Sequence, residues 1–259
     1  MHKTHFLYIA ICCLLGVLST GCSQQEDDIQ INDSSSKLHQ LYDVTENIET
    51  ESIFSSLNPA SRSSSSSNTY PVFTQKDLTY LASLSQAEFQ LVIDDFNSQL
   101  TTNERIEAEE IQDSLYIEVF NILDGHEGMD NLISFAQRYM EASQGWNSIE
   151  SLLPSNLSHQ QGEIYIRMAV YVDKIARPIY NQLVDLDNPT SRAILSNGDD
   201  PTCKWYLTQR LAIAGVAMSA EAFLDAMTGG AATPIEVVAT GADLVGIWLD
   251  YEVCNHRWH

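Results

Sequence analysis

Beyond Thr74, apolar residues recur every three or four positions, which is the spacing of one face of an α-helix. A capping box at Ser85-Gln86-Ala87-Glu88 begins one such stretch, and the same signal at Thr101 to Glu104 begins another that ends near Gly125. No segment shows the bounded alternation of apolar and polar residues that is typical of a strand. We therefore predict an all-α fold, a multi-helix bundle over residues 74–259.

Further helix starts follow from their capping residues. We expect one helix to begin at Asp130 and a short one at Asn147, which Pro154 stops. Ser158 opens a longer helix. Pro178 should kink or end it, because proline lacks the backbone N–H that an inner turn requires.

The end of the chain predicts a helical hairpin over residues 201–254. Its first helix starts at Pro201 and breaks at Gly229-Gly230, and its second starts at Pro234. At about 1.5 Å per residue, Cys203 lies roughly 36 Å before the turn and Cys254 roughly 30 Å after it. In an antiparallel hairpin the two cysteines return to the same end, where a disulfide between them is geometrically natural.

The apolar composition of this hairpin also suggests a membrane-inserting device, but its charges argue against that. The longest uncharged runs are ten residues, whereas a span needs about twenty. Glu236, Asp243 and Asp250 recur every seven residues and share one helix face, which we expect to meet water. We expect Gly215, Gly241 and Gly246 to let the two helices approach each other closely.

The first 21 residues have the layout of a secretory signal. Lys3 precedes an apolar stretch from Phe6 to Leu18, which is too short to cross a bilayer, and Gly21-Cys22 follows. This region resembles that of bacterial lipoproteins, although Ser19 stands where the usual motif has Leu or Val. The resemblance implies that Cys22 becomes the first residue of the mature protein and carries the lipid, palmitate included, that attaches it to a membrane.

The residues after the cysteine refine the expected location. Ser23-Gln24-Gln25-Glu26-Asp27-Asp28 resembles the export tag of Bacteroidota lipoproteins that are sent to the cell surface. The resemblance implies an outer-membrane protein that faces the exterior. An acidic start of an acidic chain is the alternative interpretation.

Residues 22–73 read as the acylated cysteine followed by a tether. The segment after Cys22 contains thirteen serines, including Ser63 to Ser67, and few aromatic residues. Such a composition is too polar to bury a core, so we expect disorder and a reach of roughly 40 Å. A short helix within Leu38 to Ile53 is only weakly signalled.

The net charge limits the classes of possible partner, and the cysteine content predicts a disulfide. With 35 acidic and 13 basic residues, the formal charge of −22 disfavours nucleic acid. Removal of the signal takes away Cys12 and Cys13. Lipidation of Cys22 then leaves Cys203 and Cys254, a lone pair that in an exported protein is interpreted first as a disulfide.

The sequence carries no catalytic motif that we can name, such as H-E-x-x-H, G-x-S-x-G or a P-loop, and we predict neither enzymatic activity nor a cofactor. Cys254, His256 and His259 are the best metal-ligand candidates, but we favour the disulfide at Cys254 over a metal site. The polar cluster from Asp124 to Gly128 is interpreted as a helix-to-helix loop because of its two glycines.

Three classes of function remain open. The first and favoured one is a surface-anchored helical domain that binds an unknown protein or glycan. The second is an interbacterial antagonism or immunity factor that acts through the C-terminal hairpin. The third is an envelope enzyme with an unmarked site.

Overall fold

The computed structural model describes residues 31–57, 70–184, 201–228 and 234–255, and their side chains except those of residues 31–34 and 220–237. Residues 35–259 form one compact unit. The elements along the described chain are α2 (Ile31–Glu46), β1 (Thr50–Ser52), η1 (Ile53–Leu57), β2 (Tyr70–Val72), α3 (Gln75–Ser83), α4 (Gln86–Ser98), α5 (Thr102–Ile122), α6 (His126–Glu141), α7 (Trp146–Leu152), α8 (His159–Tyr171), η2 (Val172–Ala176), α9 (Arg177–Val184), α11 (Pro201–Thr228) and α12 (Pro234–Cys254).

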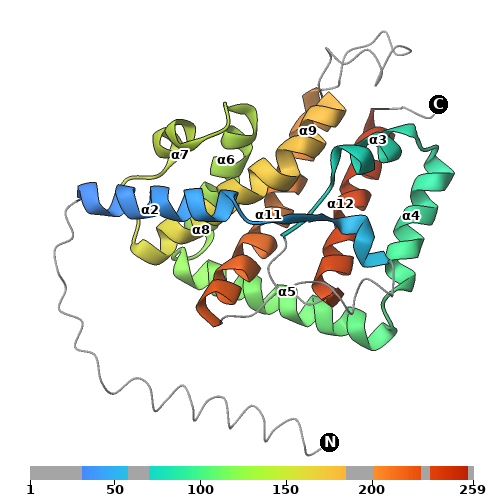
Figure 1. Ribbon diagram of the computed structural model, residues 1–259, viewed down its shortest axis with the longest axis horizontal. Helices are drawn as coiled ribbons and strands as arrows, with labels where there is room; N and C mark the ends of the chain where they lie inside the picture. The colour runs from blue at the N-terminus through green and yellow to red at the C-terminus, as the bar shows by residue number, and fades with distance from the viewer. Residues whose placement is uncertain (1–30, 58–69, 185–200, 229–233, 256–259) are drawn as a thin grey trace, which may run out of the picture. The chain divides into compact units, whose positions relative to one another are not determined.

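The fold is all-α, as predicted, and α11 is its central helix. α11 packs against α5, α6, α8 and α12 (Figure 1). Its buried side chains include Leu207, Leu211 and Val216, and α12 contributes Val245 and Trp248. The hairpin helices therefore form the middle of the core, and the remaining helices pack around them.

The predicted disulfide is confirmed. Cys203 and Cys254 are bonded across a sequence separation of 51 residues, with their Cα atoms 5.8 Å apart. Cys203 lies in the first turn of α11 and Cys254 is the last residue of α12. The bond therefore joins the start of α11 to the end of α12.

The predicted capping boxes at Ser85, Thr101 and Ser158 are all present. In each, the side chain accepts a hydrogen bond from the backbone N–H three residues later, which satisfies a group that the first helical turn leaves free. Thr74 and Asp77 form a fourth box at the start of α3, which we did not predict.

Two helix starts differ from the prediction. α6 begins at His126 rather than Asp130, because Gly125, with φ of 96°, forms its N-cap. α7 begins at Trp146 rather than Asn147, after Gly145 with φ of 112°. Both starts are set by a glycine in a backbone conformation that other residues rarely adopt, and not by a polar cap.

Pro178 does not end the helix in which it lies. The chain continues from α8 through the π-helical turn η2 into α9. In this wider turn the Arg177 N–H donates to the carbonyl of Val172, five residues back. The change of hydrogen-bond register lies directly before the residue that has no N–H to donate, and the helix runs on to Val184.

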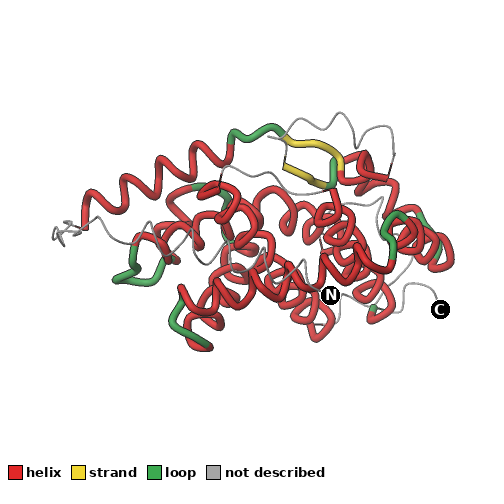
Figure 2. Tube along the Cα trace, turned by 90° about the horizontal axis from the view of Figure 1, so that it is seen from below, coloured by secondary structure: helices red, strands yellow, loops and turns green. Residues whose placement is uncertain are grey.

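The expectation of disorder over residues 22–73 is wrong for the part that the structure describes. Residues 31–57 and 70–72 form α2, η1 and two short parallel strands, which pair at Thr50 to Ser52 and Tyr70 to Val72 (Figure 2). Leu38, Tyr42 and Ile53 are buried in the common core. Val72 and Phe73 are buried there as well, so a few apolar residues attach this largely polar segment to the bundle. Residues 22–30 and 58–69, with the Ser63 to Ser67 run, lie outside the described residues.

The hairpin glycines have partners other than those we expected. A Cβ atom added to Gly215 would lie 2.5 Å from the Tyr171 ring of α8, and one added to Gly241 would lie 2.5 Å from the Phe96 ring of α4. A Cβ atom at Gly246 would meet nothing within 4 Å. The first two glycines therefore admit aromatic rings from surrounding helices, and close approach between α11 and α12 does not explain them.

Candidate binding pocket between α5, α11 and α12

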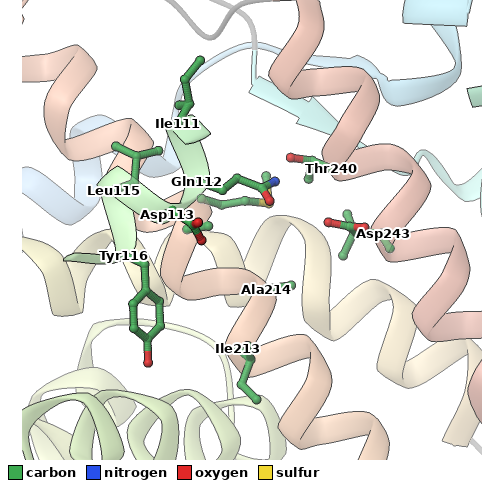
Figure 3. Close-up of a pocket in the computed structure, with 12 residues that line it drawn as sticks. Ile111, Gln112, Asp113, Leu115, Tyr116, Ile213, Ala214, Thr240 and Asp243 are labelled. Carbon is green, nitrogen blue, oxygen red and sulfur yellow. The ribbon is translucent and has the colours of Figure 1, made fainter. Parts of the chain in front are cut away.

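Helices α5, α11 and α12 surround a pocket of about 250 Å³ (Figure 3). Its lining is mostly apolar, with a few polar groups. The residues that line it are Ile111, Gln112, Asp113, Leu115 and Tyr116 of α5, Ile213, Ala214, Ala217 and Met218 of α11, and Thr240, Asp243 and Leu244 of α12.

The spacing of residues along each helix explains why the pocket forms here. Ala214 and Ala217, three residues apart, present short side chains from α11. Thr240 and Asp243 have the same spacing on α12 and face the same space. Small side chains on the central helix leave room that larger residues would fill.

Thr240 is the most informative polar residue of the pocket. The residue is only 7% exposed, and its hydroxyl makes no hydrogen bond within the part of the chain that the structure describes. Figure 3 shows this hydroxyl and the Gln112 amide directed into the same space. Because the hydroxyl is open to the cavity, a ligand bound there can supply its hydrogen-bond partner.

Two carboxylates, Asp113 and Asp243, reach the pocket from different helices. Neither forms an ion pair with another described residue. Although Asp243 keeps access to solvent, the surrounding protein removes enough water to raise the pKa of its carboxyl above the usual value, and the charge of Arg210 opposes that rise. The pocket therefore has negative charge next to an apolar wall.

A second polar cluster lies inside the bundle around Asp173. Its carboxylate accepts hydrogen bonds from the Tyr42 and Tyr139 hydroxyls at 2.9 and 2.7 Å, and from Arg177 Nε at 3.2 Å. Burial raises the pKa of the Asp173 carboxyl, and the hydrogen bonds and the Arg177 charge act against that rise. Burial likewise raises the pKa of both tyrosines, with the charge of Asp173 adding to the effect.

The Asp173 cluster is already satisfied by protein groups. Besides Asp173, Arg177 donates to the carbonyls of Tyr139, Met140 and Ala142, which are acceptors at the end of α6. The cluster thus joins α2, α6 and the π-helical turn η2 through one carboxylate. Its groups are directed at one another, so we assign it a structural role and place the candidate site at the pocket.

The sequence-predicted site residues are placed as follows. Cys22, the proposed lipidation residue, lies outside the described residues, as do His256 and His259. Cys254 is in the disulfide and is not free to bind a metal. Within the described residues, no group of three or more His, Cys, Asp or Glu side chains could hold a metal ion.

The Asp124 to Gly128 cluster is divided between a turn and the first residues of α6, so the expected helix-to-helix connection is shorter than the cluster. The Gln161 amide donates to the Asp124 carboxylate at 2.9 Å, and His126 packs edge-on against Phe120 at 4.9 Å. These contacts connect the turn to neighbouring helices.

The sequence reading missed the pocket. We expected Asp243 and Asp250 to meet water, and both residues are exposed, but Asp243 also lines the cavity together with Thr240 and Leu244. The one signal in the sequence was Thr240, a polar residue three positions before Asp243 on the same face of the helix. It had little weight without knowledge that α5 packs there.

Comparison with known proteins gives no match among family models, curated proteins or solved structures. Among the described helices, none is both long and apolar enough to cross a membrane.

Proposed function

We propose that this protein is a lipid-anchored, exported binding protein. Acylated Cys22 attaches it to the outer membrane, with the helical domain facing the exterior, and the pocket between α5, α11 and α12 binds a small ligand. The observation that carries the binding role is the combination of an apolar cavity with convergent polar groups that make no hydrogen bond or ion pair to another described residue.

The anchor and the domain are close in sequence. Ser35 is the first residue of the compact unit, and its hydroxyl donates to Glu150 at 2.8 Å. Ser35 lies thirteen positions after Cys22, and a chain of that length spans at most about 45 Å when fully extended. Acylation at Cys22 would therefore keep the start of the domain within that distance of the membrane, where the domain would meet ligands at the cell surface.

The binding role is tested by recovering the ligand with the protein. The full-length protein is extracted in mild detergent from its own membrane and examined by native mass spectrometry. We expect an additional small-molecule mass, which the pocket-filling variant Ala214→Trp should lose.

Ala87→Trp is the matched control, because Ala87 is exposed in the first turn of α4, far along the chain from the pocket residues. This variant should keep the ligand. An extracted protein that carries no small molecule, and that no compound of a broad metabolite mixture stabilises against heat, would contradict the binding role.

A further inference from the structure

The pocket has a pronounced charge asymmetry. Among the described residues that line it, two are acidic and none is cationic. The carboxylates of Asp113 and Asp243 come from α5 and α12, so they approach the cavity from two sides (Figure 3). The nearest opposing influence is Arg210, which acts on Asp243 without forming an ion pair with it.

The apolar walls of the pocket are a poor match for a fully hydrated ion. Ile111, Leu115, Ile213, Met218 and Leu244 contribute apolar surface, which is better matched by carbon atoms than by a water shell. Tyr116, which is 43% exposed, adds an aromatic residue to this lining. An ammonium group on a short apolar body suits both this lining and the two carboxylates.

Thr240 provides the independent indication that a ligand belongs here. The residue is more than nine-tenths buried, and its hydroxyl faces the cavity and makes no hydrogen bond to another described residue. A primary ammonium carries three donors, enough for two carboxylates and one hydroxyl oxygen. No anion satisfies this set without repulsion from both carboxylates.

We propose that the pocket takes an organic cation, an amine on a short alkyl or single-ring body, whose ammonium is bound by Asp113, Asp243 and Thr240. This inference rests on the proposed binding role of the same pocket. The volume of about 250 Å³ is below the range of about 300–1,000 Å³ that is typical of sites for drug-sized ligands, so the body is small. The overall charge of −22 would raise the local concentration of such cations.

The test compares three probes of similar shape and different charge, 2-phenylethylamine, 2-phenylethanol and 3-phenylpropionate. Each is titrated into the full-length protein and binding is followed by ligand-observed NMR. We expect the amine to bind about tenfold or more tightly than the alcohol, because charge-assisted hydrogen bonds are roughly twice as strong as neutral ones. The anion should show no binding.

Asp113→Asn and Asp243→Asn should each remove most of the preference for the amine. Asp250→Asn is the matched control, because Asp250 is exposed on the same helix as Asp243 and does not line the pocket. Thr240→Val, which keeps the shape, should weaken the amine several-fold. Far-ultraviolet circular dichroism establishes that each variant remains folded.

Other outcomes overturn the proposal in distinguishable ways. Equal binding of alcohol and amine would leave the pocket as a binding site and reject the cation. The cation would also be rejected if no probe binds, but the unaltered protein carries a co-purified molecule that Ala214→Trp loses. Calcium binding without amine binding, lost in Asp113→Asn and Asp243→Asn, would replace the amine by a metal ion. Absence of both probe binding and a co-purified molecule would reject the inference and the binding role together.

Discussion

The hydroxyl of Tyr42 donates a 2.9 Å hydrogen bond to the carboxylate of Asp173, a residue 131 positions further along the chain. Tyr42 lies in α2, the first helix of the described chain, and Asp173 is buried in the π-helical turn η2. Nearby, His39 stacks on Trp146 with ring centroids 4.5 Å apart, and Lys174 donates to the carbonyl of Glu46. Together these contacts attach α2 to the domain.

Removal of the Tyr42 hydroxyl should destabilise the domain measurably. Tyr42→Phe leaves the Asp173 carboxylate with one buried donor fewer, and a hydrogen bond to a charged group contributes about 1.5–3 kcal/mol. Denaturant unfolding should show a loss of that size. Tyr80→Phe, at a residue that is 48% exposed, is the control and should change the free energy of unfolding little. Equal effects of the two changes would contradict the role given to this bond.

The buried Asp173 should give the domain a characteristic pH dependence. Its pKa is raised in the folded state, so above the unfolded pKa the folded protein binds more protons than the unfolded chain. The stabilising contribution of the Asp173 carboxyl to the folded state is therefore fully present below about pH 4, which is the pKa of this group in the unfolded chain. It is lost as the pH rises through the raised folded pKa.

The comparison of the protein with Asp173→Asn between pH 3 and pH 8 isolates this effect, because the other carboxyl groups titrate in both. The difference in free energy of unfolding between the two proteins should change over the interval just described. A difference that stays constant with pH would show that the Asp173 pKa is not raised.

The disulfide should stabilise the hairpin without being needed for its helices. Its loop spans 51 residues, and removal of a native disulfide from a small exported domain costs about 2–5 kcal/mol. Cys203→Ala with Cys254→Ala should lower the unfolding temperature and keep the helical circular dichroism signal. Mass spectrometry of the non-reduced protein from its native compartment should find the two peptides linked. Two freely alkylated thiols would contradict this expectation.

Two hairpin glycines provide a matched pair of substitutions. Gly215→Ala would place a methyl group 2.5 Å from the Tyr171 ring, and overpacking of this kind costs about 1–3 kcal/mol. Gly246→Ala meets nothing within 4 Å and should stabilise α12 by up to about 1 kcal/mol through its higher helix propensity. Opposite signs of the two changes in thermal unfolding would support the packing described here, and the same sign would contradict it.

The features that the sequence predicted well are local or depend on simple geometry. A capping box such as Ser85 to Glu88 lies within four residues, and the Cys203–Cys254 bond follows from the lengths of two helices. The features that it missed depend on distant partners. The burial of Tyr42 requires Asp173, and Gly215 is explained only by Tyr171 of another helix.

The pocket belongs to the same group of missed features. Its lining comes from three helices whose mutual packing no local pattern encodes. The composition of residues 22–73 led to the wrong prediction of disorder for a related reason. An average over many serines hides the few apolar positions, such as Leu38, that the bundle buries.

The proposed anchor leads to the last prediction. Replacement of Cys22 with alanine removes the only acceptor that we propose for the lipid, so Cys22→Ala should incorporate no labelled palmitate and should be released from membranes. Cys203→Ala is the control, because it also removes a cysteine, leaves Cys22 unchanged and should stay attached. Continued palmitate incorporation in Cys22→Ala would reject this residue as the lipidation site.

The orientation of the anchored domain is tested separately, with a protease added to intact cells. If the acidic residues Glu26 to Asp28 direct export to the exterior, the domain should be cleaved or shed from cells whose periplasmic proteins stay intact. Replacement of the three acidic residues with alanine should then protect it, while palmitate labelling persists because Cys22 is unchanged. Full protection of the unaltered protein would place the anchor on the inner side of the outer membrane, where the same pocket would meet periplasmic ligands.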